Sequence, residues 1–207
     1  MRKHISLFVL LAAMFCSLTA TAQFRYGPMV GVNLTDLKFS QKLFKVDPAV
    51  GFQAGLGTEL MFPGIGFGIN SGILYEMRGA NLHLGDREIW KSQGYGKEHS
   101  YLHYVAVPIN LRFKWTRMNG LEDYFAPYIY GGPVFSLLVG HSKIGALDYA
   151  RGDVGLTAGL GFELFKNWQV QASYTWGITY AERTRLLDDF SAKNRSWNLS
   201  FIYYLPR

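Results

Sequence analysis

Large apolar residues alternate with small or polar residues along most of this chain. Between residues 50 and 62 the even positions are mostly large and apolar, whereas the odd positions are mostly glycine, glutamine or glutamate. A repeat of two residues is typical of a β-strand whose two faces meet different surroundings. The periodicity of an amphipathic helix is not evident, so the pattern predicts an all-β protein.

Eight segments carry this alternation. Two are less regular, because residues 24–34 contain Pro28 and residues 124–139 contain Gly131, Gly132 and Pro133. Proline and glycine are tolerated in strands at bulges and bends, so we expect a bulge or a bend within residues 124–139. The six regular segments are residues 50–62, 65–78, 105–115, 154–164, 168–178 and 197–205.

The connections between these segments differ in length in a regular way. Short or medium connections at residues 62–64, 116–123 and 166–167 alternate with long ones, which are residues 36–49, 79–100, 140–153 and 181–193. An up-and-down barrel in an outer membrane has short periplasmic turns and long outer loops. An even number of strands also brings the C-terminus of the barrel chain to the periplasmic side, beside the N-terminus.

Which face points outward separates a membrane barrel from a soluble one. A lipocalin-like barrel would turn its apolar face inward around a ligand. However, the interior of an eight-stranded barrel is only wide enough for filling side chains or one small ligand. The apolar face, which carries most of the Trp, Tyr and Phe residues, would overfill it. We therefore predict an eight-stranded antiparallel up-and-down transmembrane β-barrel, with its apolar face in lipid.

The first 22 residues have the features of a cleaved secretory signal peptide. A basic start is followed by the apolar residues 5–18 and by a small-residue exit that ends at Ala22. The apolar part is shorter than the roughly 20 residues that a membrane helix needs. Cys16 is the one cysteine, and the bulky Phe15 before it argues against lipidation. We expect export, cleavage and a single barrel domain at residues 23–207.

Composition excludes several classes of protein. The 207 residues are 49% hydrophobic, 16% aromatic and 17% charged, which argues against disorder. The net charge of +6 falls to +4 without Arg2 and Lys3, which gives no reason to expect nucleic-acid binding. The glycines at positions 64, 66 and 68 lie within strand alternation and not before a helix, so they do not form a phosphate loop. We expect no cofactor, no metal and a monomeric barrel.

Residues 104–114 resemble a strand motif of PorT-like outer-membrane β-barrel proteins. Similar matches cover nearly all of the expected mature chain, in residues 126–136, 153–163, 172–179 and 193–200. One departure is Ala106, which stands where the family commonly has an acidic residue. The resemblance implies the barrel fold and the outer membrane of a Gram-negative type of cell. By analogy with named members, it also implies an accessory role in type IX protein secretion.

Six charged residues fall on the face that we assign to the lumen. The acidic members are Glu59, Glu76 and Glu163, and the basic members are Arg78, Arg112 and Lys114. One interpretation is a path for ions or protons. The other, which we favour, is a packed plug of ion pairs, because small barrels are filled and buried charges are usually paired. An open diffusion pore is not expected, since channels need about 16 strands.

The long loops hold the remaining candidates for chemistry. Trp90 and Tyr95, among mixed charges in the 79–100 loop, either form a contact surface for a protein or glycan partner or pack on their own rim. His99 and His103 are about 13 Å apart along a strand, too far to share one zinc ion.

The sequence therefore favours a structural or interaction protein that contacts outer-membrane lipid and an external partner. The alternative is a hydrolase or acyltransferase at the outer rim. Such an enzyme would combine His99 or His103 with Ser100 and with Asp86 or Glu98. No spacing in the sequence establishes this arrangement, and no catalytic residue is predicted.

Overall fold

The structure, a computed structural model, describes residues 23–39, 45–62, 64, 66–83, 96–142, 147–184 and 191–206. The expected signal peptide and the loop residues Trp90 and Tyr95 lie outside these ranges. Eight long strands make up most of the described chain. They are β1 (Gln23–Phe39), β2 (Val46–Met61), β3 (Phe67–His83), β4 (Lys97–Lys114), β5 (Phe125–His141), β7 (Gly152–Leu164), β8 (Trp168–Gly177) and β10 (Ser191–Tyr203).

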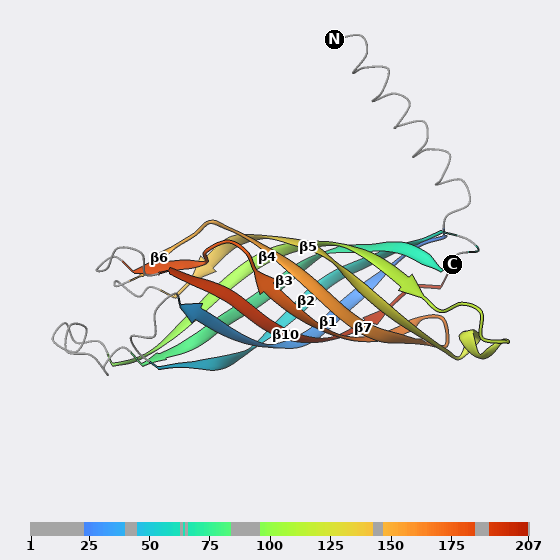
Figure 1. Ribbon diagram of the computed structural model, residues 1–207, viewed down its shortest axis with the longest axis horizontal. Coiled ribbons are helices and arrows are strands. Elements are labelled where there is room, and N and C mark those ends of the chain that lie inside the picture. The colour runs from blue at the N-terminus through green and yellow to red at the C-terminus, as the bar shows by residue number, and fades with distance from the viewer. Residues whose placement is uncertain are drawn as a thin grey trace, which may run out of the picture.

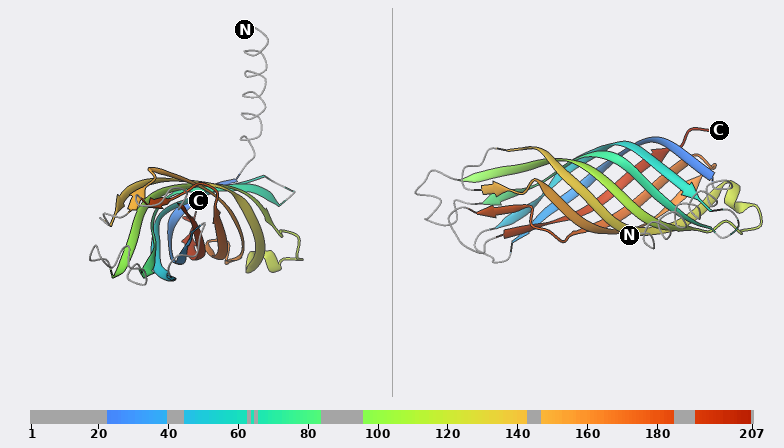
Figure 2. Two further views of the ribbon diagram at one scale, coloured as in Figure 1. Left: turned by 60° about the vertical axis from the view of Figure 1, so that its left-hand side comes forward. Right: turned by 90° about the horizontal axis from the view of Figure 1, so that it is seen from above.

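The eight long strands form a closed antiparallel barrel. Each long strand pairs with the next one along the chain, and β1 pairs with β10 to close the sheet, for example at Met29 and Ile202. Seen from the side and from above, the strands run obliquely to the long axis of the barrel (Figures 1 and 2). The predicted fold and its eight long strands are confirmed.

Two short strands, absent from the sequence prediction, lie at the long-loop end of the barrel. They are β6 (Leu147–Tyr149) and β9 (Glu182–Thr184), which pair with each other. Because β9 also pairs with the start of β10, they extend the wall beyond the end of β8. At the opposite end, a single turn of 3-10 helix, η2 (Leu121–Asp123), lies in the connection between β4 and β5 (Figure 1). No helix in the described ranges is long and apolar enough to cross a membrane.

The bulge expected within residues 124–139 occurs at Val139 and not at the glycines, because Gly140 pairs with His103 whereas Leu138 pairs with Tyr104. The pairing of β5 with β7 runs in one register from Phe125 to Leu137. The glycines instead allow close approach of the strands, because a Cβ on Gly132 would lie 2.1 Å from the backbone oxygen of Ile109. The register between β4 and β5 shifts nearer the long-loop end, between His103 and Tyr104.

The outer surface of the barrel wall is apolar, as predicted. Val50, Ile73 and Leu160 expose 69%, 64% and 63% of their surfaces, which in a soluble monomer would be an unusual apolar exterior. Exposed aromatic residues lie near both ends, with Trp168 at the short-turn end and Trp197 toward the long-loop end. Such rings favour the boundary between lipid and water.

This polarity reverses at the long-loop end of the strands. There Leu37, Leu82 and Leu102 point inward and are at most 2% exposed, and they form an apolar core with Ala80, Tyr104, Ala181 and Ala192. Outward positions at the same level are polar, as at Lys38 and His99. The strands therefore continue into residues that the sequence analysis assigned to loops, such as the last part of β1 and of β3.

Candidate functional site in the barrel lumen

Five charged side chains fill the lumen at the short-turn end of the barrel. Arg25 comes from β1, Glu59 from β2, Arg112 and Lys114 from β4, and Glu163 from β7. Each lies at an inward position of its strand, on the same face as glycines and amides, so the alternation that turns apolar residues outward brings these five together. We call this set the lower ion cluster.

Glu59 is at the centre of the lower ion cluster and is 0% exposed. Its Oε2 accepts a hydrogen bond from Arg25 Nη2 at 2.8 Å and forms an ion pair with Arg112 Nη1 at 3.1 Å. Its Oε1 lies 3.4 Å from Lys114 Nζ. One carboxylate therefore faces three cations.

Glu163 supplies the second negative charge of the lower ion cluster. Its Oε2 accepts a hydrogen bond from Arg25 Nη2 at 2.5 Å, and its Oε1 lies 3.1 Å from Lys114 Nζ. The amide of Gln169 joins the two carboxylates, because its Nε2 donates to Glu59 at 3.0 Å and to Glu163 at 2.7 Å. Three cations and two carboxylates leave the cluster with a net charge of +1.

Aromatic rings and a turn hold the two arginines of the cluster in place. The Arg112 guanidinium lies 3.5 Å from the centre of the Tyr128 ring, and that of Arg25 lies 4.9 Å from the Tyr204 ring. Arg25 Nη1 also donates to the backbone oxygen of Lys166 in the turn between β7 and β8. Stacked, desolvated contacts of this kind add to the electrostatic attraction.

A second set of charges, the upper ion cluster, lies toward the long-loop end. Arg78 donates to Glu76 through Nε at 2.8 Å and through Nη2, and it pairs through Nη1 with Asp153 Oδ2 at 3.0 Å. Asp153 also accepts hydrogen bonds from Asn194 Nδ2 and Thr179 Oγ1, both at 2.9 Å. Two carboxylates and one guanidinium give this cluster a net charge of −1.

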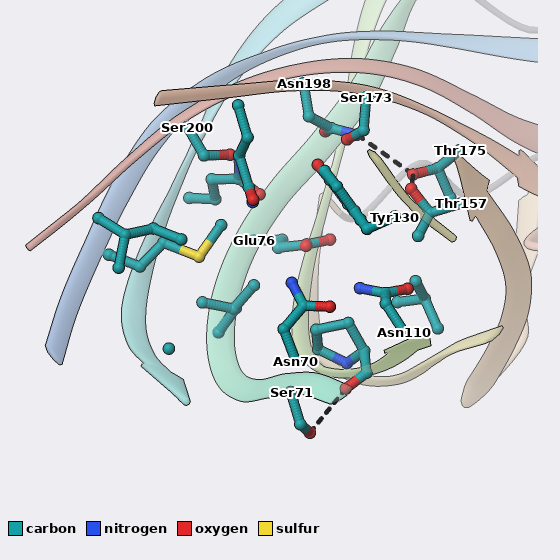
Figure 3. A pocket seen from close by; sticks show the side chains of 18 of the residues that line it. Asn70, Ser71, Glu76, Asn110, Tyr130, Thr157, Ser173, Thr175, Asn198 and Ser200 are labelled. Carbon is teal, nitrogen blue, oxygen red and sulfur yellow. Dashed lines mark hydrogen bonds between the residues drawn. The ribbon is translucent and has the colours of Figure 1, made fainter. Parts of the chain in front are cut away.

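A small cavity of ≈ 50 Å³ with both polar and apolar walls occupies the middle of the lumen. Asn70, Asn110, Tyr130 and Ser173 line it, and Glu76 of the upper ion cluster reaches its edge (Figure 3). The side-chain oxygens of Asn70 and Asn110 have no hydrogen-bond partner within the described residues. A space of this size with several polar groups on its walls has room for a few water molecules, and it is too small for a metabolite.

All six charged residues assigned to the lumen point into it, but they do not form one network. Glu59, Glu163, Arg112 and Lys114 lie together, whereas Glu76 and Arg78 pair with each other in the upper ion cluster. The sequence analysis missed two members, which are Arg25 and Asp153. Arg25 has the same parity as Gly27 and Asn33, and Asp153 the same parity as Gly155 and Thr157, so parity alone could have identified both.

The residues of the enzyme hypothesis are not brought together. His99 is exposed on the outer face of β4, whereas its neighbour Ser100 is buried on the inner face. His103 Nδ1 lies 2.7 Å from the hydroxyl oxygen of Tyr75, and Asp86 lies outside the described residues. A hydrolase built on the pair His99 and Ser100 therefore has no geometric support.

Comparisons with known proteins point in one direction. Residues 17–181 match the family model described as the outer membrane protein beta-barrel domain. A comparison with curated proteins gives no match.

Three similar solved structures are outer-membrane proteins. The outer membrane protein OprG from Pseudomonas aeruginosa has a TM-score of 0.53 and 13% identity, over 90% of this chain and 96% of that one. Ail of Yersinia pestis, the attachment invasion locus protein, was crystallised with the heparin analogue sucrose octasulfate. Its TM-score is 0.45 at 18% identity, and the match covers 88% of this chain and 99% of that one. The outer membrane enzyme PagL has a TM-score of 0.40 at 11% identity, over 86% of this chain and 99% of that one. At these identities the likeness to OprG shows the fold alone.

Proposed function

Because the chain belongs to the outer membrane protein beta-barrel domain family, we propose that it is a non-conducting outer-membrane barrel that acts through its surfaces. The observation that carries this proposal is the lower ion cluster. Arg25 and Lys114 join Glu59 on β2 to Glu163 on β7, on the opposite wall of the barrel, at a level that any solute entering from the short-turn end would have to pass.

The contacts of the lower ion cluster favour a plug over an ion path. A path needs charged groups that can exchange partners with a passing ion. Here Arg25 and Arg112 are held by both a carboxylate and an aromatic ring, and Gln169 ties the two carboxylates together. Opening the plug would leave buried charges unpaired, which costs several kcal/mol per ion.

Conductance measurements test the closed lumen. We expect wild-type protein in planar bilayers to show no stepwise conductance in concentrated KCl. Arg112→Ala combined with Tyr128→Ala removes the stacked pair and should produce channel events. The matched control is Phe135→Ala, which removes a ring from the outer face and leaves the lumen intact. Regular porin-like steps from the wild type would overturn the proposal.

The second part of the proposal concerns the partner. The resemblance to PorT-like proteins supports an accessory role in type IX protein secretion. Trp90 and Tyr95, which lie outside the described residues, are the proposed contacts for a protein or glycan partner. If the barrel neither conducts solutes nor brings His99 and Ser100 together, its external loops are the part that would contact a partner.

A crosslinking experiment tests this role directly. A photo-crosslinking residue in place of Trp90 should capture a component of the secretion machinery in intact cells. The same residue in place of Asn119, exposed in the short turn at the other end of the barrel, serves as the control. Capture of the same molecule from both positions, or of none from position 90, would contradict the partner assignment.

A further inference from the structure

A groove of ≈ 540 Å³ lies on the outer face of the barrel where β1 meets β10. Its walls are Leu34, Asp36 and Lys38 of β1, Trp176 of β8, and Arg195 and Trp197 of β10. The volume is in the range of small-molecule sites. All of these side chains are at outward positions, so the groove is separate from the lumen and its ion clusters.

The strand register gives the groove an excess of positive charge. Lys38 lies directly opposite Lys193, and Asp36 lies opposite Arg195. Like charges directly opposite each other across two strands are destabilising unless something neutralises them. The groove walls hold two cations and one carboxylate, a net charge of +1, and Lys193 adds a third cation beside Lys38. Lys193 contacts the Tyr180 ring at 5.1 Å, while Lys38 and Arg195 form no ion pair with any described residue.

The groove lies at the level where the outer face changes from apolar to polar. Below it, Val32 and Leu199 are 54% and 52% exposed on the band that faces lipid. Within it, Trp176 and Trp197 are 42% and 62% exposed, as is typical of rings at the boundary of a bilayer. The cations lie two to four residues further toward the long-loop end, at headgroup depth.

We propose that this groove binds the phosphate-bearing headgroup of a glycolipid in the outer leaflet of the membrane. Lys38 and Arg195 in the groove supply the positive charge for the phosphate, Lys193 beside Lys38 adds to it, and Trp197 and Leu34 contact the acyl chains below it. Asp36 lines the same groove, and a carboxylate can accept a hydrogen bond from a sugar hydroxyl.

The position of the groove favours a lipid over a dissolved anion. A water-soluble phosphate would need only the cations, whereas this site places an apolar wall continuous with the lipid-facing band directly beneath them. Anionic headgroups attract cations near a membrane surface by about fivefold in affinity for each charge.

The test measures retention of a diphosphorylated glucosamine lipid, lipid A, by native mass spectrometry and by titration in detergent. The test variant is Lys38→Gln with Arg195→Gln, which should bind about 25-fold more weakly than wild type. The matched control carries the same change of charge at the other end of the barrel, in Arg117→Gln with Lys166→Gln, and should bind like wild type. Heat-modifiable migration in gels confirms that each variant is folded.

Three results would overturn the proposal. One is equal retention of lipid A by wild type and the double variant. The second is equal binding of dephosphorylated lipid A. The third is binding of inorganic phosphate alone as tightly as the lipid, with the same dependence on Lys38. If the double variant does not fold, Lys38→Gln alone decides, because it should weaken binding about fivefold and an unchanged affinity would refute the site.

Discussion

Replacing Glu59 with glutamine isolates the contribution of one buried charge to the stability of the barrel. Three of its neighbours, the side chains of Arg25, Arg112 and Gln169, contact the same oxygen, Oε2, at 2.8 to 3.1 Å. Lys114 faces the other oxygen at 3.4 Å. A glutamine that keeps its oxygen toward the first three must point its NH₂ group at the ammonium of Lys114, donor against donor.

The size of the effect follows from the charge left behind. In Glu59→Gln, Glu163 is the one carboxylate that remains for three cations, and the net charge of the cluster rises from +1 to +2. Removing one partner from a buried ion pair typically costs roughly 3–5 kcal/mol, and we expect that loss in the free energy of unfolding. Lys114→Met added to Glu59→Gln restores the net charge and should return about 1–3 kcal/mol through the coupling of the two sites.

Urea unfolding in lipid vesicles, followed by tryptophan fluorescence and by heat-modifiable migration in gels, measures these differences. Asp123→Asn is the control, because Asp123 pairs with Lys166 in an exposed short turn and should leave the transition unchanged. Two outcomes would refute the reasoning. One is a loss below about 1 kcal/mol in Glu59→Gln, less than a single lost charged hydrogen bond. The other is a cost of Lys114→Met that is the same with and without Glu59.

Three further predictions concern other parts of the barrel. Gly27→Ala would place a Cβ 1.8 Å from a backbone oxygen of β10, and it should lower the free energy of unfolding by about 1–3 kcal/mol or prevent closure of the barrel. The control is Gly57→Ala in its cross-strand partner, where the atom nearest to the added Cβ is 3.6 Å away and the change should be tolerated. The yield of folded barrel measures both effects. Leu82→Ala in the apolar core at the long-loop end should cost about 2–5 kcal/mol in urea unfolding, and a loss below about 1 kcal/mol would show that this core is not packed. His103→Ala removes an exposed contact with Tyr75 and should cost at most about 1.5 kcal/mol; loss of a lipid- or ester-cleaving activity in this variant would revive the enzyme hypothesis.

The alternation of residues predicted most of the fold, because a membrane barrel sorts side chains by face more strictly than a soluble sheet does. It failed where that sorting changes. At Lys38 and His83 the outward side is polar, so the alternation predicts loops where the structure has the ends of β1 and β3. The short strands β6 and β9 could not be predicted, since three residues are too few to show a period and their pairing depends on distant segments.

The candidate site was predictable in its members more than in its arrangement. Parity along a strand tells which side chains share the lumen, but height along the axis depends on register between strands. Glu59 and Glu76 therefore looked equivalent, although they belong to the lower and the upper ion cluster. Arg25 was overlooked because it stands near the start of its strand, where the pattern is short. Its partners lie on β2 and β7, which the sequence of β1 alone cannot reveal.

The reversal of polarity at the long-loop end also sets how deep the protein can sit in its bilayer. Moving inward by two residues, roughly 7 Å, would carry Lys38 and Arg195 toward hydrocarbon, at up to about 2–4 kcal/mol for each cation near the midplane. Moving outward by the same step would lift Leu34 and Trp197 into water. In a barrel with uniform alternation, only the length of the apolar band would set its depth in the bilayer. In this barrel, a shift in either direction also moves charged or apolar side chains into the wrong medium.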